Sequence, residues 1–254
     1  MTGLIDTHAH LYEPCYMENT DELMRDMQQN GIEKIVCVGC ELETSKKTLE
    51  LCDRYPHIYA EIGFHPCDTK DLTEADWQEM IELLEHPKVV ALGEIGLDYY
   101  WENSPRDTQK YWFEKQLDYA YDKGLPIVIH SRDATAQTLE VLRAHKFHRG
   151  VFHCFSGSVE TLREIVKMGF SISLGGVVTF KNARRAVECA AAVPLDRLML
   201  ETDCPFMAPE PHRGKTNRPD YTMYVAQKIA DIRGMDVQEL VNATRENAIK
   251  MFDL

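Results

Sequence analysis

Histidines and carboxylates recur late in the short apolar runs of this 254-residue chain. The first run ends in His8-Ala9-His10, and residues two apart in a strand face the same side, so Asp6, His8 and His10 would share a face. Two imidazoles on one face can bind a metal ion, although such a pair also occurs on solvated strands. The pair alone leaves both interpretations open.

Later apolar runs end in the same residue types. These positions are His65, Glu94, His130, His153, Glu201 and Asp203. Each has an ordinary structural explanation, such as a hydrogen-bonded core histidine or a turn residue. Their recurrence at successive strand ends favours a shared metal site, because the C-terminal ends of parallel barrel strands meet on one face, where active sites are built.

The elements that must position these residues are eight apolar runs alternating with stretches of helical spacing. The runs cover residues 4–10, 34–40, 58–66, 89–98, 126–133, 150–157, 170–176 and 198–205. Strict alternation predicts parallel strands joined by helical crossovers, and eight such units predict an α/β fold, a (β/α)8 or TIM barrel of the metal-dependent hydrolase type. An open doubly wound sheet is the alternative, but GxGxxG after the first strand and a Walker A loop are both absent.

Two more helical stretches, about 220–233 and 236–252, follow the last run as extra C-terminal helices. No linker or internal repeat interrupts the chain, so we expect one domain over residues 1–254. No apolar run is long enough to span a bilayer, and the N-terminus has no secretion signal. We therefore expect a cytoplasmic protein without a membrane partner, eight cysteines present as thiols, and a monomer in preference to an oligomer.

The charge balance, 28 basic minus 41 acidic residues, gives a net charge of −13. Such a field does not attract nucleic acid, so an anionic substrate must be attracted locally. Arg132 directly follows His130-Ser131, while Arg213, Lys215 and Arg218 lie in the loop 209–219. These cations can contact phosphates or be solvated. The aromatic residues Tyr99, Tyr100 and Trp101 can stack on bases or pack within their loop.

Six motifs together resemble the TatD family of metal-dependent deoxyribonucleases, within the amidohydrolase superfamily. They are His8-Ala9-His10, Gly63-Phe64-His65-Pro66, Gly93-Glu94-Ile95-Gly96-Leu97-Asp98, His130-Ser131-Arg132, His153-Cys154-Phe155-Ser156-Gly157 and Leu200-Glu201-Thr202-Asp203. The resemblance runs from the first strand to the C-terminus with the motifs in order. The set is highly specific, although its single members are not.

The resemblance implies two divalent metal ions. One ion would be held by His8, His10, Glu94 and Asp203, and the other by Glu94, His130 and His153, with Glu94 bridging. Asp203 would be the general base, and His65 would contact the scissile phosphate or the water. Glu201 and Asp6 would support the ligands, and substrate contacts are expected from His65, Arg132, Ser156 and Arg213. Magnesium or manganese would function, although four imidazoles also suit zinc, which a crystal can contain. No organic cofactor is expected.

The function expected from these residues and the resemblance is hydrolysis of DNA phosphodiesters, as an exonuclease on single strands or frayed ends. A small-molecule amidohydrolase or esterase is the main alternative, and an aminoacyl-tRNA ester hydrolase is another. The carboxylated lysine of many superfamily members is replaced here by Glu94, which favours the nuclease branch. A non-catalytic metal-binding module is disfavoured by two open sites with a candidate base.

Overall fold

A computed structural model describes residues 1–101 and 103–254, and the chain divides into two compact units. One comprises residues 1–37 and 153–254, and the other residues 38–152. The eight strands follow one another in sequence order, with helices between them. This is the strand order of a (β/α)8 barrel with C-terminal helices, as predicted. The expectation of a single domain stays a prediction.

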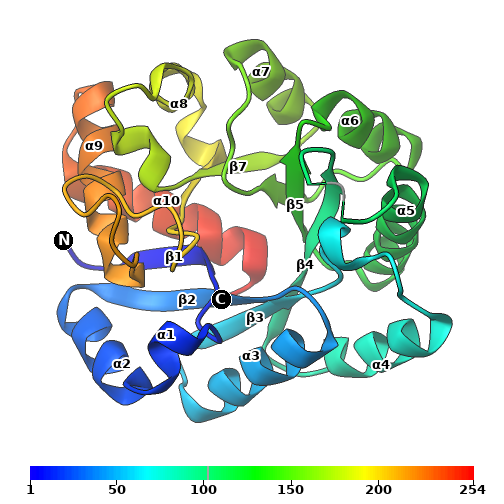
Figure 1. The fold of residues 1–254 in the computed structure, drawn as a ribbon. Coiled ribbons are helices and arrows are strands. Elements are labelled where there is room, and N and C mark those ends of the chain that lie inside the picture. Colours follow the sequence, from blue (N-terminus) through cyan, green and yellow to red (C-terminus); the bar gives the residue numbers. More distant parts are fainter. Residues whose placement is uncertain (102) are drawn as a thin grey trace. The chain divides into compact units, whose positions relative to one another are not determined.

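The first unit carries the start and the end of the chain. Its elements are β1 (Leu4–Ala9), α1 (Pro14–Met17), α2 (Thr20–Gln29), the beginning of β2 (Ile32–Gly39), α7 (Val159–Lys167), β7 (Ser171–Leu174), η2 (Gly176–Thr179), α8 (Arg184–Ala192), η3 (Leu195–Arg197), β8 (Leu198–Leu200), η4 (Pro219–Tyr221), α9 (Thr222–Arg233) and α10 (Val237–Phe252). The strand pairs β1 with β2 and β7 with β8 are parallel. The C-terminal helices α9 and α10 pack on β1, so the two ends of the chain share one core (Figure 1).

The second unit holds the middle strands and their helices. Its elements are the end of β2, α3 (Leu42–Arg54), β3 (Ile58–Ile62), η1 (Pro66–Asp68), α4 (Glu74–Leu84), β4 (Val89–Asp98), α5 (Arg106–Lys123), β5 (Ile127–Arg132), α6 (Thr135–Ala144) and β6 (Gly150–Phe152). Parallel pairing joins β3, β4, β5 and β6 in that order. Near-continuous burial of residues such as Ile127, Val128 and Ile129 is typical of strands covered on both faces.

Local sequence explains where the helices begin and end. The Ser158 hydroxyl accepts from the Thr161 amide at 3.3 Å and caps α7, a position that serine favours. The buried face of α7 is formed by Leu162 and Ile165, and Gly169, at a φ of 98°, follows its end. None of the helices within the described residues combines the length and apolar character required to cross a membrane.

Three strands end at least four residues earlier than the apolar runs suggest. β3 stops at Ile62, β6 at Phe152 and β8 at Leu200. His65 instead caps the short helix η1, whose first residue is Pro66, because proline suits the first helical position and donates no strand hydrogen bond. Candidate site residues after these strands therefore lie on loops and turns directly beyond the strand ends.

Two buried glutamines on α5 fix the loops around the site. The Gln116 amide accepts from the Phe64 N–H at 2.7 Å and donates to the Phe64 carbonyl, directly before His65. Gln109 accepts from the Asp98 N–H at 2.9 Å and donates to the Asp98 and Ser104 carbonyls. Each glutamine is 1% exposed, so its amide replaces the backbone partners that an ended strand lacks.

Candidate active site

The first unit brings His8, His10 and Asp203 together. His8 and His10 extend from β1 and its end and are buried, as expected from their alternation. The Nε2 atom of His10 lies 3.1 Å from Asp203 Oδ1, and that of His8 lies 3.7 Å from the same oxygen. Asp203 is held in place by its own backbone, because its N–H donates to the His8 carbonyl at 2.9 Å.

The carboxylate of Asp203 is maintained in its charged form. Burial alone would raise its pKa, but the hydrogen bond from His10 and the charges of the neighbouring imidazoles hold the pKa below its ordinary value. An ionised carboxylate beside two imidazoles is a suitable metal ligand and proton acceptor.

His153 and Glu201 complete the group in the first unit. The rings of His8 and His153 stack with centroids 4.0 Å apart, and ligand atoms of His8, His153 and Glu201 lie within 4.8 Å of one another. Glu201 accepts from the Cys154 N–H at 2.6 Å, which fixes the turn that carries His153. A second donor, the buried Ser173 hydroxyl, also binds this carboxylate. Ser173 has no site role in the sequence interpretation, since an alternating strand serine carries no distinctive signal.

Asp6 supports the backbone of the site. Its carboxylate accepts from the N–H groups of Thr202 and His8 at 2.9 and 3.3 Å, and from the Thr202 hydroxyl at 2.5 Å. The sequence predicts that Asp6 supports a ligand histidine. The hydrogen bond that Asp6 accepts from His8 comes from the main-chain N–H of His8 and not from its ring. Asp6 thereby connects β1 with the segment that carries Glu201 and Asp203.

Replacement of Asp6 by alanine would leave these buried donors without their acceptor. We expect the free energy of unfolding to fall by about 2–4 kcal/mol in urea titrations. Zinc affinity should fall by about 10–100-fold, as when a group supporting a ligand is removed. Asp6→Asn, which keeps one acceptor oxygen, should show smaller losses. Unchanged zinc affinity in Asp6→Ala would show that Asp6 acts on folding alone.

The same residue predicts a pH dependence of stability. Burial raises the pKa of Asp6 from 3.8 to about 8, because the charged form is poorly solvated there. The folded carboxyl therefore retains a proton that the unfolded chain releases, and its stabilising contribution is present below pH 3.8 and lost as the pH rises to about 8. In metal-free buffer, unfolding free energies should show this decline for the native chain and a flatter profile for Asp6→Ala.

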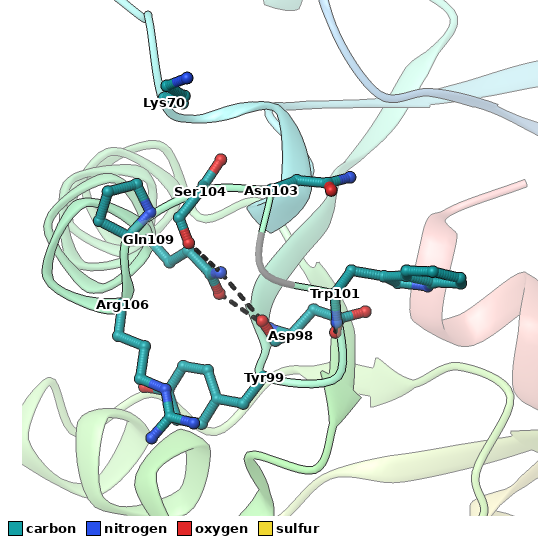
Figure 2. A pocket seen from close by; sticks show the side chains of 9 residues that line it. Lys70, Asp98, Tyr99, Trp101, Asn103, Ser104, Arg106 and Gln109 are labelled. Atoms are coloured by element: carbon teal, nitrogen blue, oxygen red, sulfur yellow. Dashed lines mark hydrogen bonds between the residues drawn. The ribbon is translucent and has the colours of Figure 1, made fainter.

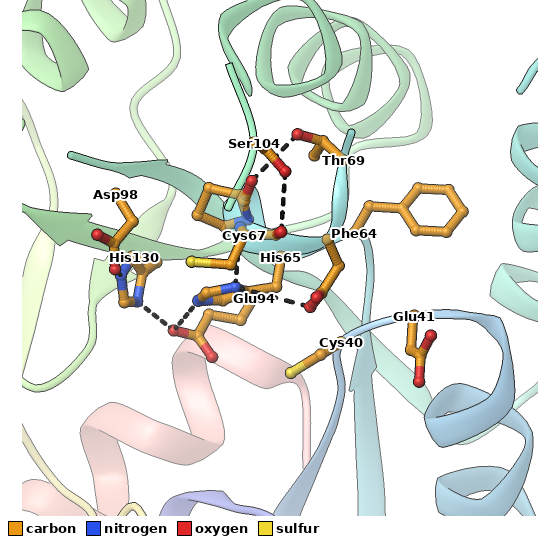
Figure 3. Close-up of polar contacts among 12 residues, drawn as sticks. Cys40, Glu41, Phe64, His65, Cys67, Thr69, Glu94, Asp98, Ser104 and His130 are labelled. Atoms are coloured by element: carbon orange, nitrogen blue, oxygen red, sulfur yellow. Dashed lines mark hydrogen bonds and ion pairs between the residues drawn. The ribbon is translucent and has the colours of Figure 1, made fainter. Parts of the chain in front are cut away.

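The second unit forms its own cluster around Glu94, which is 3% exposed on β4. His130 Nδ1 lies 2.5 Å from Glu94 Oε1, and His65 Nε2 lies 3.6 Å from the same oxygen (Figure 3). The rings of the two histidines meet edge to face at 4.5 Å. Ligand atoms of His65, Glu94 and His130 lie within 4.8 Å of one another.

Asp98 is a site residue that the sequence interpretation assigned no role. Its Oδ2 lies 2.9 Å from His130 Nε2, while its Oδ1 accepts from the N–H groups of Tyr100 and Trp101. A carboxylate that binds one nitrogen of a ligand histidine fixes the other nitrogen toward the metal side. A signal was present, because positions 94 and 98 share one face of β4.

The electrostatics of His130 follow from its two carboxylate partners. Burial disfavours the charged ring, but Glu94 and Asp98 outweigh burial and raise the pKa to about 9. A cation bound by Glu94 and Nδ1 would take the place of this proton, so metal affinity at this cluster should increase with pH.

Gly96 allows β4 and β5 to approach each other between these two carboxylates. It adopts a φ of 144° and pairs with His130, and an added Cβ would lie 2.0 Å from the His130 carbonyl oxygen. Only glycine fits there without moving the backbone of His130. The second glycine of the Gly93-Glu94-Ile95-Gly96 motif therefore serves the placement of His130.

The expected substrate contacts lie in different surroundings. Arg132 stacks over Tyr100, with its Cζ 3.9 Å from the ring centroid, and Arg213 stacks over Phe180 at 4.3 Å. Ser156 is exposed in the loop after β6. Arg218, from the same basic loop as Arg213, pairs with Asp26 and Asp220 at 3.2 and 3.0 Å. Arg218 is thus engaged in the structure of its own unit.

Each unit therefore offers clustered imidazole and carboxylate ligands directly after parallel strands. Such mixed sets suit zinc, manganese or iron and accept magnesium through their carboxylates. The donor chemistry fits divalent metal ions. Together with the strand order, these clusters define the class of protein as a metal-dependent hydrolase of the α/β-barrel type.

Comparison with known proteins identifies the family. The model of the family described as TatD related DNase matches residues 5–253, so the chain belongs to the TatD family. An uncharacterized metal-dependent hydrolase, YabD of Bacillus subtilis, is 45% identical over 251 residues, covering 98% of each chain. A 3'-5' ssDNA/RNA exonuclease TatD of Citrobacter rodentium is 30% identical, covering 99% of this chain and 98% of that protein.

A solved relative shares the fold over nearly the whole chain. The crystal structure of YJJV, a TatD homologue from Escherichia coli K12, matches with a TM-score of 0.94 and 30% identity. The match covers 99% of this chain and 98% of that one. The likeness confirms the barrel fold that the sequence predicts.

Proposed function

We propose that this protein hydrolyses phosphodiester bonds of single-stranded DNA, or of frayed duplex ends, as an exonuclease that uses two divalent metal ions. The observation that carries the proposal is the pair of buried histidine and carboxylate clusters, one in each unit, within a chain of the TatD family. The name of the Citrobacter relative, a 3'-5' ssDNA/RNA exonuclease, supports the choice of nucleic acid as substrate.

The two clusters divide the ligand positions. We infer that His8, His10 and Asp203 belong to one ion and His130 and His153 to the other, with Glu94 shared. The family resemblance supports this assignment, and the distances within each unit support the grouping of His8 and His10 with Asp203 and of His130 with Glu94. His153, whose ring stacks on that of His8, is assigned to the second ion from the resemblance alone. Two divalent ions would supply charge stabilisation for the transferring phosphoryl group and a lowered pKa for the attacking water.

Asp203 and His65 have the properties of groups that act on the reacting atoms. The Asp203 carboxylate remains ionised and can accept the proton of the attacking water. His65 Nδ1 accepts from the Cys67 N–H at 3.2 Å, so the neutral ring carries its proton on Nε2. That N–H faces the Glu94 side and can donate to a phosphate oxygen.

A single assay separates this proposal from hydrolysis of other bonds. The purified protein, loaded in parallel with magnesium, manganese or zinc, is incubated with end-labelled single-stranded DNA, with RNA, with an aminoacyl-tRNA and with a panel of small esters and amides. We expect progressive shortening of the DNA and loss of activity in EDTA. Turnover of the small esters alone, or full activity after metal removal, would refute the proposal.

A further inference from the structure

A pocket of about 320 Å³ lies beside the candidate active site, within the second unit (Figure 2). It is lined by the end of β4, by described residues of the loop that follows, by the first turn of α5 and by Lys70. The lining residues that matter here are Lys70, Asp98, Trp101, Asn103 and Arg106. Because Asp98 also binds His130, the pocket begins one hydrogen bond away from a proposed metal ligand.

The polar groups on the inner wall of the pocket are already engaged. Both oxygens of Asp98 have partners, in the backbone N–H groups of Tyr100 and Trp101 and in His130. The Gln109 amide is used by the backbone of Asp98 and Ser104. The inner wall thus offers a ligand few further hydrogen bonds. The negative charge of Asp98 is directed toward His130.

The outer wall presents side-chain donors that the described residues leave available. The side chains of Lys70, Asn103 and Arg106 make no hydrogen bond or ion pair with residues 1–101 or 103–254. The Arg106 guanidinium stacks on the Tyr99 ring at 4.2 Å, which orients its plane without using its N–H donors. In a chain with a net charge of −13, two cations without a described acidic partner form a local positive site.

Trp101 lies on the side of the pocket away from Arg106 and is part of an exposed aromatic surface (Figure 2). Trp101 is 50% exposed and Tyr100 is 53% exposed, and their rings meet edge to face at 4.9 Å. Arg132 stacks over Tyr100 and holds this pair beside the end of β5. Exposed aromatic rings next to cations are the combination that single-stranded nucleic acids bind, by base stacking and phosphate contacts.

We propose that this pocket binds the nucleotide next to the one that hydrolysis releases. Arg106 and Lys70, which lie at opposite sides of the pocket, contact the phosphodiesters on either side of this nucleotide, Asn103 donates to an oxygen of one of these groups, and Trp101 stacks on its base (Figure 2). The inference rests on the proposed phosphodiesterase function and adds a subsite to it. It requires no sequence preference, because every base has a face that can stack.

The test compares Arg106→Glu and Lys70→Glu with Lys146→Glu. Lys146 is an exposed cation that precedes β6, so it lies at the opposite end of the strands within the same unit. The substrates are single-stranded decathymidylate and a dithymidine phosphate, and kcat and KM are measured over a range of sodium chloride. Thermal unfolding of each variant establishes that it is folded.

We expect Arg106→Glu and Lys70→Glu each to raise KM for the decamer about tenfold, with kcat little changed. The slope of log KM against log salt should fall by about 0.7 for each phosphate that the variant no longer binds. The dinucleotide is too short to fill both sites, so its KM should change much less. Trp101→Ala should also raise the decamer KM, and Trp101→Phe should restore it.

Three results would overturn the subsite. The first is an equal KM for Arg106→Glu and Lys146→Glu. The second is an equal change in KM for the decamer and the dinucleotide. The third is a KM for Trp101→Phe that remains as high as that for Trp101→Ala. A decamer with a 5′ phosphate, compared with one without, distinguishes an internal phosphodiester from a terminal phosphate as the bound group. An effect confined to the phosphorylated end would refute the internal assignment.

Failure of the proposed function has a different signature. If the native protein cleaves esters and no nucleic acid with any metal, the phosphodiesterase proposal fails. Fluorescence anisotropy with a labelled decathymidylate then still decides the subsite. The subsite is supported if Arg106→Glu weakens binding of the decamer and Lys146→Glu preserves it. Absence of binding by the native protein would exclude the subsite.

Discussion

Asp203→Asn is expected to lower kcat for single-stranded DNA by at least about 10²–10⁴-fold while the protein remains folded. The substitution removes the negative charge and one acceptor from a carboxylate that lies 3.1 Å from His10 and 3.7 Å from His8. If Asp203 both holds a metal ion and accepts a proton, both contributions disappear together.

Asparagine is the informative replacement because it respects the backbone. Asp203 has a φ of 54°, in the left-handed region, which asparagine tolerates as well as aspartate does. The hydrogen bond from its N–H to the His8 carbonyl does not involve the side chain. Thermal unfolding should therefore change little, and any loss of activity reflects the missing carboxylate.

The matched control is Asp196→Asn, an exposed aspartate that precedes β8 at the other end of the same strand. It should retain native kcat and KM. Metal content per chain, measured after gel filtration, separates the two roles of Asp203. Full metal occupancy with lost activity would indicate that Asp203 acts as the proton acceptor. Reduced metal occupancy would indicate that it acts as a metal ligand. Native activity in Asp203→Asn would contradict both.

The elements of the fold could be predicted because their signals are local. Periodic apolar positions, the Ser158 cap and the glycine after α7 each report on a few neighbouring residues. The strand ends were less predictable, since an apolar run continues into buried loop residues such as Phe64 and Phe155. There the chain leaves the sheet because side chains such as Gln116 replace the strand hydrogen bonds.

The candidate ligands could be proposed from residue type and strand position, and Glu201 and Asp6 could be proposed as their supports, but other supporting residues were not identified. Asp98, Ser173 and Gln109 act through tertiary hydrogen bonds whose partners lie at least 11 residues away. Arg218 shows the same limit in reverse, since its ion pair with Asp26 spans 192 residues. A basic loop therefore predicts a local charge and not which cations remain available to a substrate.

His130→Ala is expected to reduce activity on single-stranded DNA by about 10³-fold or more, since it removes a proposed metal ligand. Asp98→Asn should cost less, about 10–100-fold, because Asp98 acts by orienting His130 and not by touching the reacting atoms. The asparagine amide can place its nitrogen, in place of the carboxylate oxygen, beside His130 Nε2. His130 then no longer keeps its proton on Nε2, so Nδ1 is less consistently available as a metal ligand on the Glu94 side.

The double variant tests this dependence directly. If Asp98 works only through His130, then Asp98→Asn should produce no further loss in the His130→Ala background, so the two free-energy changes should be strongly non-additive. Equal losses in both backgrounds would show that Asp98 has a role of its own, such as shaping the neighbouring pocket. His86 and Asp53, paired at 3.2 Å elsewhere in the same unit, provide the control. His86→Ala and Asp53→Asn should leave activity unchanged. The effect would then depend on the position of His130 and Asp98 beside Glu94, and not on the loss of any histidine–carboxylate pair.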